Sequence, residues 1–179
     1  MYYYAWYAYY FVYIYMGIFI MNEYMKIALK MAEKAYKNND IPVGAVVVKD
    51  GKIIAKAYNK KNKLNDPTCH AEILAIRKAC KKIKDFRLEG AEVYVTKEPC
   101  IMCYGALLSA RVKTIYFGAY DKKYTILNLN EHFSFNHKAE LVGGVMEEEC
   151  SKMLVDFFSK LRSDKNANTN TKNTTKENR

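Results

Sequence analysis

The sequence lacks the cysteine pattern of a disulfide-stapled protein. It has five cysteines in 179 residues, and an odd number cannot all pair within one chain. Two of them, Cys100 and Cys103, form a Cys-x-x-Cys unit. In a reducing compartment such a unit indicates either metal binding or redox chemistry, and the residues around it decide between the two.

Charged residues are absent from positions 1–20, where eight of the twenty residues are Tyr. About twenty apolar residues can span a bilayer, but the Tyr phenol prefers the membrane interface. No basic residue precedes the stretch and no small-residue cleavage site follows it, so it does not resemble a signal peptide. An amphipathic helix then begins at Met21. We interpret Met21 as the true start and residues 1–20 as translated upstream sequence, with a membrane anchor as the alternative.

Large apolar residues are absent from the other end, residues 163–179, which is rich in Asn, Thr and Lys. Such a segment cannot bury enough surface to offset its ordering entropy. We expect a disordered tail that is simply solvated, although a weak contact with RNA is the alternative. One domain of ordinary size, residues 21–162, remains between the two ends.

Acidic residues are outnumbered, with 19 Asp and Glu against 29 Lys and Arg. A basic domain attracts polyanions, of which nucleic acid is the commonest in a cell. Charge alone does not decide, because lysine also serves as a solubilising surface residue.

Apolar periodicity predicts alternating strands and helices across the domain. A hairpin is expected at 43–48 and 53–58 with an Asp-Gly turn, followed by a helix from about Thr68. A strand at 91–96, a helix from Cys100 to about Ala110 and a strand at 114–119 come next. A short strand at 141–146 and a helix at 147–161 complete the pattern. Alternation of this kind indicates an α/β layer fold.

Two motifs carry the chemistry: Cys69-His70-Ala71-Glu72 and Pro99-Cys100-Ile101-Met102-Cys103. Each opens a predicted helix, and a spacing of three puts both Cys100 and Cys103 sulfurs on one helix face. Two thiolates and the His70 imidazole give Zn²⁺ three protein ligands and leave a fourth position open for water, which is a catalytic arrangement. Glu72 can take the water's proton and deliver it to a ring nitrogen and then to a leaving amine.

The combination of His-x-Glu and Pro-Cys-x-x-Cys, in this order, is the signature of zinc-dependent deaminases of nucleobases. A lone Cys-x-x-Cys is more often redox-active or structural, so the pairing carries the inference. Cys69 points away from the ligand face, and Cys80 and Cys150 fall on inner helix faces, so we interpret these three as packed thiols. The residue pattern does not decide whether His132 and His137 touch a substrate.

The domain also resembles the bacterial tRNA-specific adenosine deaminases, the TadA family of the cytidine and deoxycytidylate deaminase superfamily. The resemblance rests on residues 41–46 (IPVGAV), 65–73 (NDPTCHAEI), 94–103 (YVTKEPCIMC), 117–119 (FGA), 136–137 (NH), Glu140, 143–145 (GGV) and 147–150 (EEEC). It implies a three-layer α/β/α cytidine-deaminase-like fold with a central mixed sheet of about five strands.

By the same resemblance, the chain is a cytoplasmic hydrolase that converts adenosine to inosine at the wobble position of a tRNA anticodon, with tRNA-Arg as the expected partner. One Zn²⁺ per subunit and a homodimer are also implied. Asn59 falls where the family holds the target nucleoside, and Asp121 where it contacts the substrate backbone. The loop after Asp121 departs from the family pattern, because residues 122–130 are bulky and contain no glycine.

Three other functions remain open at this point. A deaminase of free cytosine or guanine would share the zinc centre, and the basic surface favours tRNA over it. A non-catalytic RNA-binding subunit should have lost the proton shuttle, whereas Glu72 is present. A membrane-anchored protein rests on residues 1–20 alone.

Overall fold

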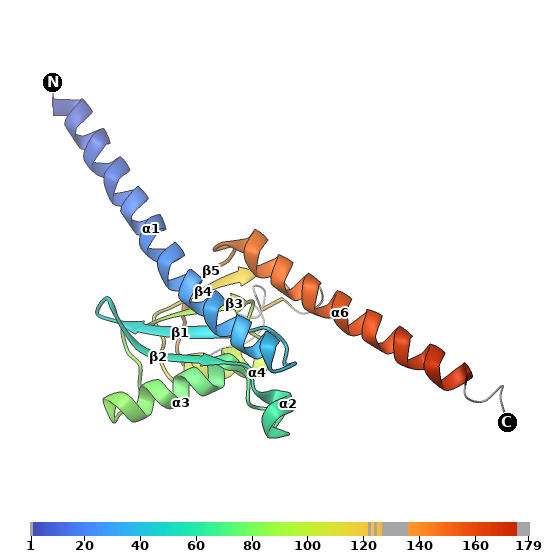
Figure 1. Ribbon diagram of the computed structural model, residues 1–179. Coiled ribbons are helices and arrows are strands. Elements are labelled where there is room, and N and C mark those ends of the chain that lie inside the picture. The colour runs from blue at the N-terminus through green and yellow to red at the C-terminus, as the bar shows by residue number, and fades with distance from the viewer. Residues whose placement is uncertain (1, 122, 124, 127–135, 175–179) are drawn as a thin grey trace.

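The computed structural model describes residues 2–121, 123, 125–126 and 136–174. A five-stranded sheet lies between two layers of helices, with the strand order β2-β1-β3-β4-β5 (Figure 1). The sheet is mixed: β1 pairs antiparallel with β2 and β3, whereas β3, β4 and β5 are parallel. The predicted three-layer α/β/α fold is therefore confirmed.

The hairpin forms where the Asp-Gly pair predicts it. Strands β1 (Gly44–Lys49) and β2 (Lys52–Tyr58) flank Asp50 and Gly51, which both have positive φ, of 51° and 68°. Positive φ at both central residues twists a two-residue turn in the sense that antiparallel strands require. The hairpin ends at Tyr58, which places Asn59 at the same edge of the sheet as the start of β1.

The parallel half of the sheet contains β3 (Glu92–Lys97), β4 (Thr114–Ala119) and β5 (Glu140–Val142), with α4 (Ile101–Ser109) crossing from β3 to β4. β5 is shorter than the predicted strand, which extended to Met146. It ends before Gly143 because Gly144 has a φ of 83°, outside the range of a strand. The carboxyl ends of β3 and β4 meet at one edge, where open α/β sheets place their ligands.

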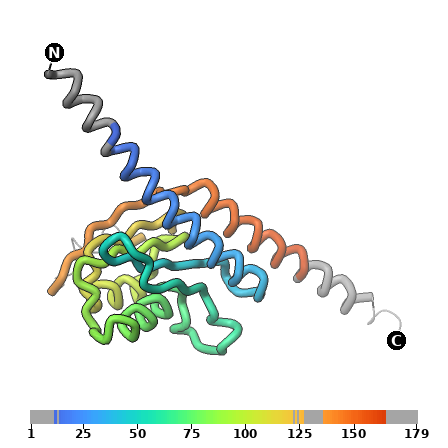
Figure 2. The backbone as a smooth tube through the Cα atoms, turned by 60° about the vertical axis from the view of Figure 1, so that its left-hand side comes forward, coloured from blue at the N-terminus to red at the C-terminus, as the bar shows by residue number. Residues whose placement is uncertain are grey.

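One face of the sheet is covered by α3 (Ala71–Ile83) and α4, and the other by α1 (Tyr2–Lys37) and α6 (Glu147–Thr174) (Figures 1 and 2). Two glycines allow the second layer to approach. A Cβ on Gly44 would lie 2.0 Å from the Ala28 carbonyl oxygen of α1, and one on Gly118 would lie 2.3 Å from the Cys150 sulfur of α6. Both helices of this layer therefore pack directly on the backbone of the sheet.

α1 begins earlier than the predicted helix, which started at Met21. Packing on the sheet begins near Met25, which is fully buried, whereas the described side chains between Val12 and Ile20 are all exposed. Figure 2 shows this part of α1 extending past the edge of the sheet. Within the described residues, no helix combines the length and apolarity needed to cross a membrane.

α6 also continues beyond its predicted end near Leu161, as far as Thr174. The helical backbone of residues 163–174 differs from the disordered tail that the composition led us to expect, because helical hydrogen bonds can extend a packed helix beyond its last apolar contact. Three acidic residues in the first turn, Glu147 to Glu149, suit the positive end of the helix dipole.

Candidate active site

The structure brings His70, Cys100 and Cys103 together at the carboxyl edge of the sheet. His70 and Cys100 occupy the N-cap positions of α3 and α4, and Cys103 lies in the first turn of α4. The His70 Nδ1 atom is 3.6 Å from the Cys100 sulfur and 3.4 Å from the Cys103 sulfur. All three ligand atoms lie within 4.8 Å of one another.

These distances fit a tetrahedral zinc ion. Zn–S bonds of about 2.3 Å and Zn–N bonds of about 2.0 Å place a ligand nitrogen and a ligand sulfur about 3.5 Å apart. The thiol chemistry also fits, because a hydrogen bond from Cys103 lowers the pKa of Cys100 to about 3 and keeps a thiolate in the site at neutral pH. The same hydrogen bond raises the pKa of Cys103, whose thiol would lose its proton on binding a cation.

A turn stabilised by Asp66 aims His70 at the two sulfurs. Asp66 Oδ1 accepts hydrogen bonds of 2.7 Å from both the amide and the hydroxyl of Thr68. Asp66 Oδ2 accepts a 3.1 Å hydrogen bond from the Cys69 thiol, and this bond raises the pKa of Cys69. Cys69 is therefore a buried, protonated thiol that faces away from the metal ligands.

Glu72 lies in the first turn of α3, two residues after His70, and only 4% of its surface is exposed. Burial raises the pKa of its carboxyl group. A carboxyl group with a raised pKa can both accept and release a proton near neutral pH, which is what a proton shuttle requires.

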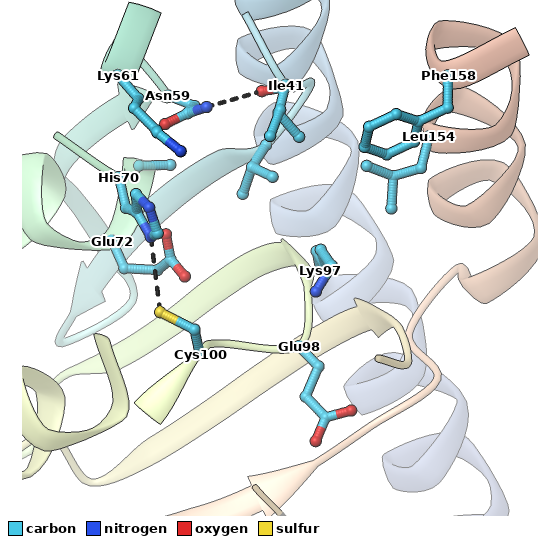
Figure 3. Close-up of a pocket in the computed structure, with 12 residues that line it drawn as sticks. Ile41, Asn59, Lys61, His70, Glu72, Lys97, Glu98, Cys100, Leu154 and Phe158 are labelled. Atoms are coloured by element: carbon cyan, nitrogen blue, oxygen red, sulfur yellow. Dashed lines mark hydrogen bonds between the residues drawn. The ribbon is translucent and has the colours of Figure 1, made fainter. Parts of the chain in front are cut away.

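A cavity of about 240 Å³ opens beside this group. An apolar cavity of about 150 Å³ accepts a benzene ring, so there is room here for one heterocyclic base. Figure 3 shows the arrangement of the lining residues, which come from both faces of the site: Ile41, Val43, Asn59, Lys61, His70, Ala71, Glu72, Lys97, Glu98, Cys100, Leu154 and Phe158. Leu154 and Phe158 belong to α6, and no motif in the sequence indicates that this helix reaches the cavity.

Asn59 lines the cavity, and its side chain is hydrogen-bonded to Asp40. The Asn59 amide nitrogen donates to the Asp40 carboxylate and to the Ile41 carbonyl oxygen, both at 3.3 Å. These two acceptors fix which end of the amide is the nitrogen. Within the described part of the chain, Asn59 Oδ1 is the buried side-chain oxygen that has no hydrogen-bond partner. An acceptor therefore remains available to a ligand.

Asp121 does not line the cavity. Its carboxylate accepts a 2.5 Å hydrogen bond from Lys97 Nζ, and Lys97 lines the cavity instead. A lysine at the end of a strand is usually a solvated side chain, so only the spatial pairing of β3 with β4 identifies Lys97. In the loop after Asp121, positions 122, 124 and 127–130 lie outside the described residues.

Cys80, Cys150 and His137 lie away from the cavity. Cys150 is buried, which raises its pKa to about 12, and Cys80 donates to the Phe86 carbonyl oxygen, as expected of packed thiols. His137 bonds the Val112 carbonyl oxygen at 2.7 Å, just before the start of β4 and at the opposite edge of the sheet from the metal ligands. His132 lies outside the described residues.

Three comparisons with known proteins agree with this geometry. The family described as "Cytidine and deoxycytidylate deaminase zinc-binding region" matches residues 20–119. A tRNA-specific adenosine deaminase of Bacillus subtilis is 49% identical over 148 residues, which cover 80% of this chain and 92% of the relative. A solved structure from work on A-to-I editing by deaminases at the wobble position of transfer RNA has a TM-score of 0.71 and 38% identity. It covers 74% of this chain and 99% of its own.

A guanine deaminase structure from Bacillus subtilis is also similar, with a TM-score of 0.54 and 37% identity, but it covers only 61% of this chain. The chain has the features of a zinc-dependent deaminase: a three-layer α/β/α fold, the His/Cys/Cys group and a buried glutamate beside it. Within that class, the chain belongs to the tRNA-specific adenosine deaminase family.

Proposed function

We propose that the protein hydrolyses adenosine to inosine at the wobble position of a tRNA anticodon, with Glu72 as the proton shuttle. The observation that carries the proposal is the convergence of Glu72 and the three metal ligands on a cavity with room for one base. Membership of the tRNA-specific adenosine deaminase family supports adenosine as the base and tRNA as its carrier.

In this proposal His70, Cys100 and Cys103 hold one Zn²⁺ per subunit. Bound zinc acts as a Lewis acid that makes water nucleophilic at neutral pH. The Glu72 carboxylate takes one proton from the attacking water and delivers it to a ring nitrogen of adenine. It then passes the proton of the newly formed hydroxyl group to the amine, which leaves as ammonia while the carbonyl of inosine forms. The net reaction adds one water to the nucleoside and releases one ammonia.

The chain's own residues bind and orient the nucleotide. Asn59 presents its free amide oxygen to a hydrogen-bond donor on the target nucleotide. Lys61 and Lys97 line the cavity, and Lys60 and Lys63 lie beside Lys61, so the rim carries positive charge where an RNA backbone would approach. Asp121, paired with Lys97, holds one of these cations at the rim. We take tRNA-Arg as the tRNA and the cytoplasm as the compartment.

We further propose that the active form is a homodimer. Support comes from α4, where Ile101 is 65% exposed and Met102 is 37% exposed directly beside the ligands Cys100 and Cys103. Large apolar side chains gathered next to an active site are typical of interaction surfaces. Light scattering after size exclusion would report the mass, and a monomer at micromolar concentration would contradict this part of the proposal.

The decisive experiment offers the purified protein four substrates: tRNA-Arg with adenosine at the wobble position, free adenosine, cytosine and guanine. Inosine in the tRNA and an equal amount of ammonia are expected from tRNA-Arg alone. Glu72→Gln should lower the rate at least about 100-fold, as expected for a general acid–base residue, while zinc content stays unchanged. Glu89→Gln, at an exposed position, serves as the matched control. Release of ammonia from a free base with no inosine in tRNA would overturn the assignment.

A further inference from the structure

Glu98 is a buried carboxylate beside the metal-binding turn that neither the metal nor the proton shuttle uses. It stands between β3 and Pro99-Cys100, and only 2% of its surface is exposed. In Figure 3 its carboxylate points away from His70 and Cys100. Burying a carboxylate is costly unless hydrogen-bond donors surround it, so its partners indicate what it does.

Among the described residues, three groups donate hydrogen bonds to this carboxylate, and all three belong to residues that follow β4. The Asp121 amide donates to Oε2 at 2.8 Å. The Thr125 hydroxyl and the Ile126 amide both donate to Oε1 at 2.7 Å. Glu98 therefore binds Asp121 at one point of the segment after β4 and Thr125 and Ile126 at a second point, and the Ile126 side chain, 1% exposed, is fixed in the core.

The segment in turn fixes the charged rim of the cavity. With its amide held by Glu98, Asp121 accepts hydrogen bonds from Lys97 Nζ through Oδ2 and from the Lys123 amide, at 2.9 Å, through Oδ1. Lys97 precedes Glu98 in the chain and lines the cavity. Lys97 and Glu98, which are adjacent in the chain, thus both bind Asp121. Glu98 binds it from inside the protein and Lys97 from the rim of the cavity.

The metal ligands have supports of their own. Cys100 is the N-cap of α4, where its carbonyl oxygen accepts a 2.8 Å hydrogen bond from the Tyr104 amide, and the Asp66 turn orients His70. Loss of the hydrogen bonds that Glu98 accepts from Asp121, Thr125 and Ile126 should therefore loosen the rim while His70, Cys100, Cys103 and Glu72 stay in place.

We infer that Glu98 is a positioning residue that sets the affinity for the nucleic-acid substrate. It does so by holding Asp121, Thr125 and Ile126 in place, and with them the pair Asp121 and Lys97 at the mouth of the cavity. The inference rests on the proposed function, since it assigns a polyanionic substrate to that rim. It assigns different roles to two residues on either side of Pro99: Cys100 is a metal ligand, and Glu98 positions the residues that bind the substrate.

The test compares Glu98→Gln with the wild-type protein. The amide keeps the shape of the side chain but turns an NH₂ group toward backbone donors, so at least one charge-assisted hydrogen bond is lost. We expect KM for tRNA to rise about tenfold, which is the worth of one such bond, whereas kcat and zinc content stay within about twofold. Hydrogen exchange at the amides of Asp121 and Ile126 should accelerate.

Two further variants keep the test decisive. Thr125→Val removes only the hydroxyl donor and should give a smaller rise in KM, which remains measurable if Glu98→Gln fails to fold. Glu92→Gln, the same substitution at the opposite end of β3, is the matched control and should leave KM unchanged.

The outcomes distinguish this inference from the proposed function. If the wild-type protein forms no inosine in tRNA, the proposed function fails, and amide exchange still reports whether Glu98 holds the segment. If the wild-type protein is active and Glu98→Gln leaves both KM and amide exchange unchanged, the inference is overturned. A loss of zinc or of kcat at constant KM would also overturn it, because Glu98 would then serve the metal.

Discussion

Asn59 is the residue whose hydrogen bonds say most about substrate contact. Its amide nitrogen donates hydrogen bonds to Asp40 and Ile41, and its amide oxygen has no partner among the described residues and can accept a hydrogen bond from a ligand in the cavity. Asn59→Ala should therefore raise KM for tRNA about tenfold, the effect of one hydrogen bond. The melting temperature should change little, because Asp40 keeps the amides of Asn62 and Lys63 as donors at 3.1 Å.

Asn59→Asp makes the complementary change. It keeps an acceptor toward the cavity but places a second carboxylate against buried Asp40, and like charges in contact are strongly unfavourable. We expect a clear loss of thermal stability, measured by calorimetry, and not a selective rise in KM. An unchanged KM in Asn59→Ala would show that the free oxygen makes no contact with the substrate.

Residue types and spacing were enough to predict that His70, Cys100 and Cys103 lie together as a group that can hold a metal ion. His70, Cys100 and Cys103 sit at helix starts, where the local sequence decides which way a side chain points. The roles of Lys97 and Glu98 could not be found in this way. Their partners lie 23 to 28 residues further along the chain, and only the parallel pairing of β3 with β4 brings them together.

At the scale of elements, α2 (Lys61–Leu64) presents a basic turn at the mouth of the cavity. Replacing Lys61 and Lys63 with Ala should weaken tRNA binding at low salt. Each lost phosphate contact to a single strand should also reduce the slope of log K against log salt by about 0.7. Binding titrations at several salt concentrations measure both effects.

The matched control for α2 removes Lys81 and Lys82, which lie in the last turn of α3. Ten residues of helix put them about 15 Å from the first turn of α3, where Glu72 lies. These lysines should contribute little to the salt dependence. Equal slopes for the two double variants would mean that positive charge acts as a general field and α2 has no special role.

Most elements were predictable because their apolar periodicity is local. β4 occupies the predicted residues 114–119, and α4 begins one residue after the predicted start at Cys100. α2 was not predicted, because a single turn has no periodicity of its own. Its N-terminal amides depend on Asp40, 22 residues earlier in the chain.

At the scale of the whole molecule, the contribution of residues 1–20 to folding and activity can be tested by removing them. We predict that a chain beginning at Met21 folds, binds zinc and deaminates tRNA as the longer chain does. Burial of α1 against the sheet begins only at Met25, and Tyr24 still covers Tyr94 at a ring distance of 5.1 Å. Ile14 and Ile18 line one cavity together with Tyr94 and Tyr116, so a small loss of stability is expected.

That loss should stay near 1 kcal/mol, or about 2 to 4 °C in melting temperature for a chain of this size. Calorimetry and tRNA kinetics on the two lengths of chain measure it. A much larger fall would show that residues 1–20 belong to the folded body. Mass spectrometry of the native N-terminus addresses the start independently, because a peptide containing Trp6 would mean that the Tyr-rich segment is translated and retained.

Fourteen exposed large apolar side chains are described in the protein, and seven of them lie between Val12 and Ile20. Removing that segment should therefore also reduce self-association, which light scattering on the two chains detects.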